Sequence, residues 1–88
     1  MLIFNKWVSW QLIENSIYVF DERTNQLYGF DSTAKEIWTA IYMNMYVHEV
    51  INYVCSLYPN VEAEIIKYDV TTHIDNLIEL ELISYAKR

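Results

Sequence analysis

The spacing of apolar residues changes about a third of the way along this chain of 88 residues. Val8, Trp10 and Leu12 alternate with polar residues, which is the spacing of a strand with one buried face. Beyond residue 33, apolar residues instead recur three and four positions apart, as they do on amphipathic helices. The chain therefore predicts a small sheet followed by helices, with no internal repeat and no linker between them.

Three short segments are expected to form an antiparallel meander. Residues 8–12 form the first strand, and residues 17–20, which are apolar on both faces, suit the central strand. Residues 26–30 form the third strand, which contains Gly29, the only glycine of the chain. Glycine weakens a strand and often marks a place where another backbone comes close. A bulge or a local change of twist explains Gly29 equally well at this stage. A further segment, residues 82–85, is too short to assign.

Three helices are expected after the sheet. Asp31, Ser32 and Thr33 are possible N-caps of the first helix, and Thr33 with Glu36 fits a capping box. Pro59 ends the second helix. The third begins near Glu62, whose charge suits a helix N-terminus. The stripe expected to be buried on this third helix comprises Ile66, Val70, Ile74 and Leu77, with His73 as an alternative to Ile74 and Leu80 as a further candidate. The sum is a single α+β domain, a winged helix-turn-helix-like arrangement in which a three-stranded antiparallel sheet is followed by three helices.

The charge balance limits what this domain, residues 1–88, binds. Twelve acidic and six basic residues give a formal net charge of −6, and no basic stripe is present to neutralise phosphates. A winged helix of this charge is a poor candidate for binding nucleic acid. No apolar run approaches the ~18 residues of a membrane-spanning helix, and residues 1–7 do not form a secretory signal. We expect a cytoplasmic protein that binds neither nucleic acid nor membrane.

The residues that most often carry catalysis or bind metals are few and scattered. Cys55 is the only cysteine, and its apolar surroundings on the second helix are typical of a small buried residue. His48 and His73 belong to different helices, and neither has a companion ligand at helical spacing. We therefore expect no enzyme activity, no metal site and no cofactor.

The segment that opens the first helix resembles a known family. Phe30–Trp38 reads Phe-Asp-Ser-Thr-Ala-Lys-Glu-Ile-Trp, similar to the Leu-Asn-x-Thr-Ala-x-x-Ile-Trp segment of the PqqD-like family, also called precursor-peptide recognition elements. The pairs Glu49-Val50, Asp69-Val70 and Leu82-Ile83 follow in the family's order. The resemblance runs from about Ile17 to Ile83.

Two positions depart from the family pattern. Tyr42, Met43 and Asn44 stand where the family usually has Asp-Gly, and Glu81 stands where it usually has glycine. A glycine there adopts a left-handed helix cap at no steric cost, whereas Glu81 would lose roughly 1 kcal/mol in that conformation. We therefore expect the third helix to be longer or differently capped.

The resemblance implies both a fold and a role. Such domains resemble winged helices, bind peptides and are not catalysts. They hold the leader of a ribosomally synthesised precursor peptide and deliver its core to a modifying enzyme, such as a radical S-adenosylmethionine enzyme or a leader peptidase. The leader is typically taken up as an extra strand beside the third strand, packed against the third helix.

The third strand has independent features of a binding edge. Residues 26–30 contain no proline, lysine or inward charge to protect an exposed edge, and an added strand gains main-chain hydrogen bonds. Alternation puts Gln26, Tyr28 and Phe30 on one face. Leu27 and Gly29 lie on the other, and which face lines the groove stays open.

One flank of the third helix would complete the groove. Ile65 and Tyr68 suit an apolar leader residue, and Asp69, together with neighbouring polar residues, suits polar groups. A structural hydrogen bond or a local charge pair explains Asp69 equally well. The residues expected to bind the peptide are Gln26, Leu27, Tyr28, Gly29, Phe30, Ile65, Tyr68, Asp69, Thr72, His73 and Asn76.

Two functions from different classes are consistent with the sequence. The first is a non-catalytic adaptor that binds a leader peptide by strand addition. The alternative is an acidic winged-helix module that mediates protein–protein assembly without recognising a leader. The two differ because only the adaptor binds a short linear peptide in extended form. A monomer is expected, although an exposed edge strand can pair with a second copy.

Overall fold

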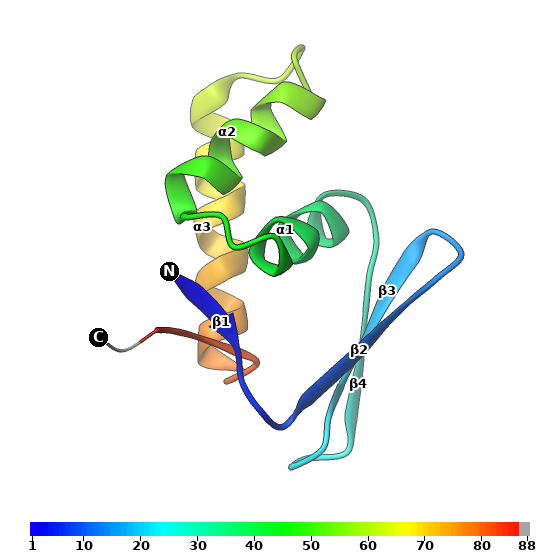
Figure 1. The fold of residues 1–88 in the computed structure, drawn as a ribbon. Coiled ribbons are helices and arrows are strands. Elements are labelled where there is room, and N and C mark those ends of the chain that lie inside the picture. The colour runs from blue at the N-terminus through cyan, green and yellow to red at the C-terminus, as the bar shows by residue number, and fades with distance from the viewer. Residues whose placement is uncertain (87–88) are drawn as a thin grey trace.

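Three strands and three helices follow one another in the order that the sequence predicts. In the computed structural model, which describes residues 1–86, they are β2 (Val8–Ile13), β3 (Ser16–Asp21), β4 (Gln26–Phe30), α1 (Ser32–Tyr42), α2 (Val47–Leu57) and α3 (Ala63–Glu79). Figure 1 shows the sheet on one side of α1, with α2 and α3 on the other. The α+β class and the sheet-then-helices order are confirmed.

The sheet is a regular meander with β3 in the centre, as predicted. β3 pairs antiparallel with β2 on one side and with β4 on the other. Val19 is opposite Trp10 in β2 and opposite Tyr28 in β4. Every residue of β4 has a partner in β3, and Gly29 is paired with Tyr18. A bulge therefore does not account for Gly29.

Trp38 on α1 is the centre of the core between sheet and helices. It is fully buried, and its ring stacks on Phe4 with the ring centroids 4.3 Å apart. Trp10 from β2 and Phe30 from β4 approach the same ring at 6.3 Å and 5.6 Å. On α3 four residues of the predicted stripe are buried, Ile66, Val70, Ile74 and Leu77, whereas the further candidate Leu80 is 43% exposed. The sheet and the helices thus share one apolar core, as a domain of this size requires.

A second sheet joins the two ends of the described chain. Strand β1 (Leu2–Phe4) pairs antiparallel with β5 (Ile83–Tyr85), and we call this pair the terminal clasp. Leu2 and Ile83 are buried in it, whereas Ile3 is 41% exposed. Local sequence pattern does not predict β1 and β5, because each strand has only three residues and their pairing joins segments nearly a whole chain length apart.

The start of α1 agrees with the predicted capping only in part. The N-cap is Asp31, one of the three expected candidates, but it makes no side-chain capping bond, so the predicted capping box of Thr33 and Glu36 is wrong. The Glu36 carboxylate instead accepts a hydrogen bond from the Tyr53 hydroxyl at 2.9 Å, which joins α1 to α2. At the start of α2, the Tyr46 backbone N–H donates to Glu49 at 2.8 Å.

A polar cluster joins the β3–β4 turn of the sheet to the C-terminal end of α3. The buried Asp21 carboxylate accepts from Arg23 Nη2 at 3.1 Å, and Arg23 Nη1 lies 3.4 Å from the Glu81 carboxylate. The hydrogen bonds from Arg23 hold the pKa of Asp21 below its usual value. Arg23 also lies over the Trp7 ring at 4.2 Å, and Trp7 Nε1 donates to the Glu81 carbonyl at 2.9 Å. The sheet is therefore held in a defined position relative to α3.

Helix α3 ends in the geometry that usually requires glycine. Glu81 has a φ of 61°, its N–H donates to the Ile78 carbonyl, and the Leu82 N–H donates to the Leu77 carbonyl. These two bonds define a Schellman motif with Glu81 at the left-handed position. The expectation of a longer or differently capped helix is therefore wrong. Hydrogen bonds from Asn5 and Trp7 to the Glu81 carbonyl help to offset the strain.

We expect Glu81→Gly to leave the stability unchanged or to raise it by up to about 1 kcal/mol, because glycine relieves the left-handed strain. The loss of the exposed pair with Arg23 opposes this gain by a few tenths of a kcal/mol. Urea denaturation measures the difference, with Asp75→Gly at an exposed position inside α3 as the matched control that should destabilise. A large loss of stability in Glu81→Gly would show that the carboxylate matters more than the backbone conformation.

Candidate peptide-binding groove

The outer edge of β4 has unpaired backbone groups, and their positions follow from the hydrogen-bond alternation. The Glu22 N–H donates to the Trp7 carbonyl, which fixes the phase of the β2–β3 ladder. Antiparallel residues alternate between hydrogen-bonded and non-hydrogen-bonded pairs. Through the registers of the sheet, Leu27 and Gly29 are the β4 residues whose N–H and C=O groups point away from β3. No described strand pairs with this edge.

The two faces of β4 meet different surroundings, which answers the question that the sequence left open. Tyr28 and Phe30 are half-buried and pack against the core. Leu27 is 64% exposed, and Gly29 shares its outer face. Gln26 is exposed at the start of the strand. An additional strand beside β4 would thus have one face toward the helices and the other on the outside of the sheet.

His73 is the residue of α3 that the structure brings against β4. Its ring meets Phe30 edge to face, with the centroids 5.5 Å apart. Its Nε2 atom is buried and has no hydrogen-bond partner among the described residues. Burial lowers the pKa of His73, so the ring is neutral at physiological pH. This contact joins α3 to the last residue of β4.

Four other predicted residues of α3 lie exposed beyond His73. Asp69 and Asn76 are four positions before it and three positions after it, so they share its side of the helix. Ile65 and Thr72 continue the same flank, and Ile65 is 51% exposed. Asp69 also borders a small pocket with Thr33, Val54, Tyr58, Val61 and Ile66. The flank thus has apolar and polar groups that are free to meet a partner.

Tyr68 lies at the solvent-facing margin of this flank. It is three positions after Ile65 and four before Thr72, so it shares their side of the helix, but it is turned ~140° away from His73 and is 70% exposed. It borders a shallow hollow with Glu64, Lys67 and Thr71. The role of Tyr68 in peptide binding stays a prediction from the sequence.

Comparisons with known proteins identify the family. A family model described as "Coenzyme PQQ synthesis protein D (PqqD)" matches residues 17–83, about three quarters of the chain. The chain belongs to the PqqD family. A comparison with curated proteins gave no match.

Two solved structures share the fold of this PqqD-family chain. One is described as "TbiB1 in Complex with the TbiA(beta) Leader Peptide", with 20% identity and a TM-score of 0.86. The other is described as "Lasso peptide synthetase B1 complexed with the leader peptide", with 17% identity and a TM-score of 0.85. Both alignments cover 96% of this chain and 98% of the other. The likeness therefore extends beyond residues 17–83 of the family match.

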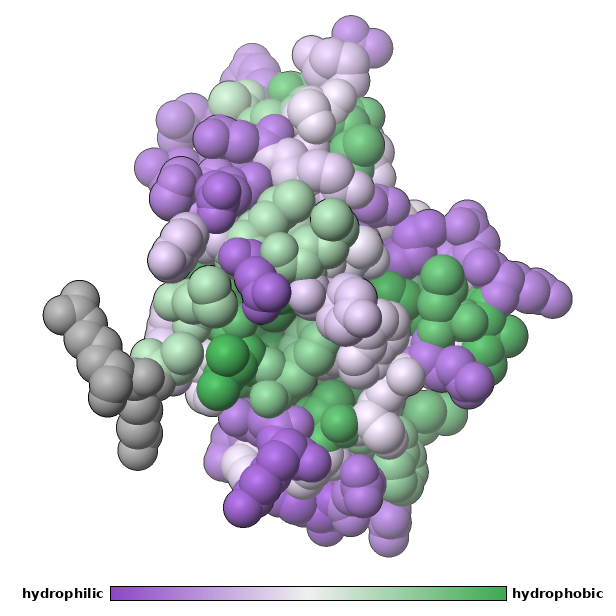
Figure 2. Space-filling view, in the orientation of Figure 1, coloured by the Kyte–Doolittle hydropathy of each residue, from purple (hydrophilic) through white to green (hydrophobic). Residues whose placement is uncertain are grey.

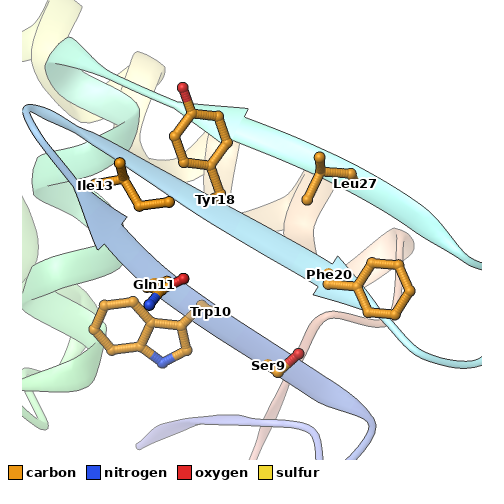
Figure 3. Close-up of a pocket in the computed structure, with 7 residues that line it drawn as sticks. All are labelled: Ser9, Trp10, Gln11, Ile13, Tyr18, Phe20 and Leu27. Atoms are coloured by element: carbon orange, nitrogen blue, oxygen red, sulfur yellow. The ribbon is translucent and has the colours of Figure 1, made fainter.

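The outer face of the PqqD-family sheet has an apolar surface that the sequence analysis did not consider as a site. A shallow hollow there is lined by Ser9, Trp10, Gln11, Ile13, Tyr18, Phe20 and Leu27. Figure 3 shows Ile13, Tyr18 and Leu27 projecting from adjacent strands, and Figure 2 shows apolar surface on the sheet side of the molecule. The signal was available, because residues 17–20 are apolar on both faces, and a solvent-facing outer face needs no such residues.

No group of three or more His, Cys, Asp or Glu side chains in residues 1–86 is placed to hold a metal ion. Cys55 is half-buried on α2. None of the described helices is long and apolar enough to cross a membrane.

Proposed function

We propose that this chain is an adaptor that binds the leader of a ribosomally synthesised precursor peptide and presents it to a modifying enzyme. The observation that carries the proposal is the open edge of β4, where Leu27 and Gly29 direct unpaired N–H and C=O groups outward beside α3. Adding a strand to such an edge supplies affinity through main-chain hydrogen bonds, and pockets on either side supply selectivity. Membership of the PqqD family and the likeness to two chains described as leader complexes support this role.

The proposed adaptor is not itself a catalyst. Its function requires it to bind both the leader and a modifying enzyme, and a radical S-adenosylmethionine enzyme or a leader peptidase suits that second role. The peptide-binding residues we propose lie in β4 and on the flank of α3 that contains His73. The role places the protein in the cytoplasm, where a newly made precursor is first available.

The test compares the two free edges of the sheet with the same substitution. Leu27→Pro removes an outward N–H from β4, and Leu12→Pro removes an outward N–H from β2. Both positions are non-hydrogen-bonded within the sheet, so proline is tolerated there. The probe is a synthetic peptide with the N-terminal half of the nearest short open reading frame in the genome that encodes this chain. We expect Leu27→Pro to weaken binding of this peptide at least ~10-fold. Proline removes a main-chain hydrogen bond between neutral groups, and its ring also prevents the close approach of the peptide strand.

Leu12→Pro is expected to bind the peptide as the unchanged protein does, and Leu27→Ala, which keeps the N–H, should lose much less than Leu27→Pro. Calorimetry gives the affinities, and amide NMR shifts in β4 and α3 locate the peptide. Equal losses in the two proline variants would place the peptide elsewhere. No binding by the unchanged protein would favour the assembly module, which the same titration with the neighbouring modifying enzyme would then reveal.

A further inference from the structure

Gly29 leaves a gap in the outer face of β4 that its backbone does not require. Its φ is not positive, and its pairing with Tyr18 is regular. A Cβ built on Gly29 meets only Tyr18 ring atoms, at 3.6 Å and 3.8 Å, which is ordinary van der Waals contact. A larger residue is therefore compatible with the fold, and glycine in a strand costs stability. Neither the backbone conformation nor the available space explains glycine at this position. The free edge of β4 offers an explanation, because a strand added there would lie beside Gly29.

The geometry of strand pairing determines what would occupy this gap. Side chains of residues directly opposite one another in an antiparallel pair lie on the same face of the sheet. A peptide residue opposite Gly29 therefore has its side chain on the outer face. Neighbouring strands are only ~4.8 Å apart. Because Gly29 has no Cβ, the peptide side chain can extend over its backbone and contact the Tyr18 ring. This step rests on the proposed function, because it needs a peptide strand on β4.

The surroundings of the gap are apolar and uncharged. Tyr18 is 39% exposed, and Leu27 and Ile13 are exposed on the same face. None of the residues that line the adjoining hollow is charged (Figure 3), although the chain as a whole has a formal charge of −6. Such a surface favours a large apolar side chain, and an aromatic one gains most because ring pairs across strands stabilise beyond their buried area.

We propose that Gly29 and Tyr18 form a specificity site for the leader, which takes an aromatic side chain on the outer face of the sheet, opposite Gly29. Recognition of the leader is then two-sided. The inward side chains of the peptide meet α3 near His73, and one outward side chain packs over Gly29 on Tyr18. Glycine at this position is the condition for the second contact.

The experiment fills the gap without disturbing the edge. Gly29→Val keeps both outward backbone groups and adds a β-branched side chain where the peptide side chain would lie. We expect an unchanged or higher melting temperature, because valine favours strands, together with ~10-fold weaker binding of the synthetic leader peptide. Ser9→Val is the matched control, since it adds the same side chain to the outer face of β2, opposite Phe20, and should bind as the unchanged protein does.

Two Tyr18 variants test the same contact from the other side. Tyr18→Phe keeps the ring and should bind within about two-fold of the unchanged protein, whereas Tyr18→Ala should bind several-fold more weakly. The effect of Tyr18→Ala should disappear when the peptide residue that NMR places opposite Gly29 is itself alanine, because the two changes remove one contact.

The outcomes separate this inference from the proposed function. If Leu27→Pro abolishes binding while Gly29→Val and Tyr18→Ala bind normally, the adaptor role stands and the specificity site is wrong. A polar or charged peptide residue opposite Gly29 would also overturn it. If the unchanged protein binds no leader, both proposals fail together.

Discussion

Replacing Trp38 with alanine is expected to cost about 3–5 kcal/mol of folding stability. The ring is fully buried and is the common contact of β1, β2 and β4 through Phe4, Trp10 and Phe30. Small domains have total stabilities of only ~5–15 kcal/mol, so the variant should be partly unfolded without denaturant. Urea denaturation followed by far-UV circular dichroism measures the loss and does not depend on the fluorescence of the removed ring.

Two variants control for this effect. Tyr42 belongs to the same aromatic cluster, 5.0 Å from Trp10 between ring centroids, but it is 60% exposed, so Tyr42→Ala should cost much less. Trp38→Phe keeps a ring against Phe4 and removes a buried indole N–H that has no acceptor among the described residues, so it should lose less than alanine. Equal losses in Trp38→Ala and Tyr42→Ala would contradict a core centred on Trp38.

The terminal clasp is expected to contribute nearly as much as the central ring. Leu2→Ala should cost about 2 kcal/mol or more, because Leu2 is buried and the cavity lies next to core residues. Ile3→Ala, on the exposed side of the same strand, should cost less than about 1 kcal/mol. The same denaturation experiment compares the two. Similar small losses for both would show that the clasp is dispensable for the stability of the domain.

The elements with a strong apolar period were predictable from the sequence. The meander of β2, β3 and β4 followed from alternation, and the buried stripe of α3 followed from helical spacing. The clasp was not predictable in this way, because three residues give too short a pattern and the partner strand is almost a full chain length away. Local patterns also missed the cap of α3, where tertiary hydrogen bonds to the Glu81 carbonyl help to hold a residue that local preference disfavours.

The candidate groove was predictable in outline and not in detail. An unprotected third strand indicated the edge, but the sequence did not show which face of β4 is buried. That depends on Tyr28 and Phe30 packing against the core, where Phe30 meets Trp38 of α1 and His73 of α3. Spacing groups Tyr68 with Ile65 and Thr72, but it does not show how far this side of α3 lies from β4. The outer surface around Tyr18 was not predicted, because apolar residues on both faces of residues 17–20 are also typical of a central strand.

The terminal clasp has a consequence for the order of folding. Leu2 is opposite Tyr85, so this contact joins residues at almost the largest sequence separation that the described chain allows. Contacts of this kind form late, because the entropy of closing a long loop precedes their gain. β1 is synthesised before every other described element and β5 after all of them. During synthesis, Leu2 and Phe4 must therefore remain without their strand partner until β5 has left the ribosome.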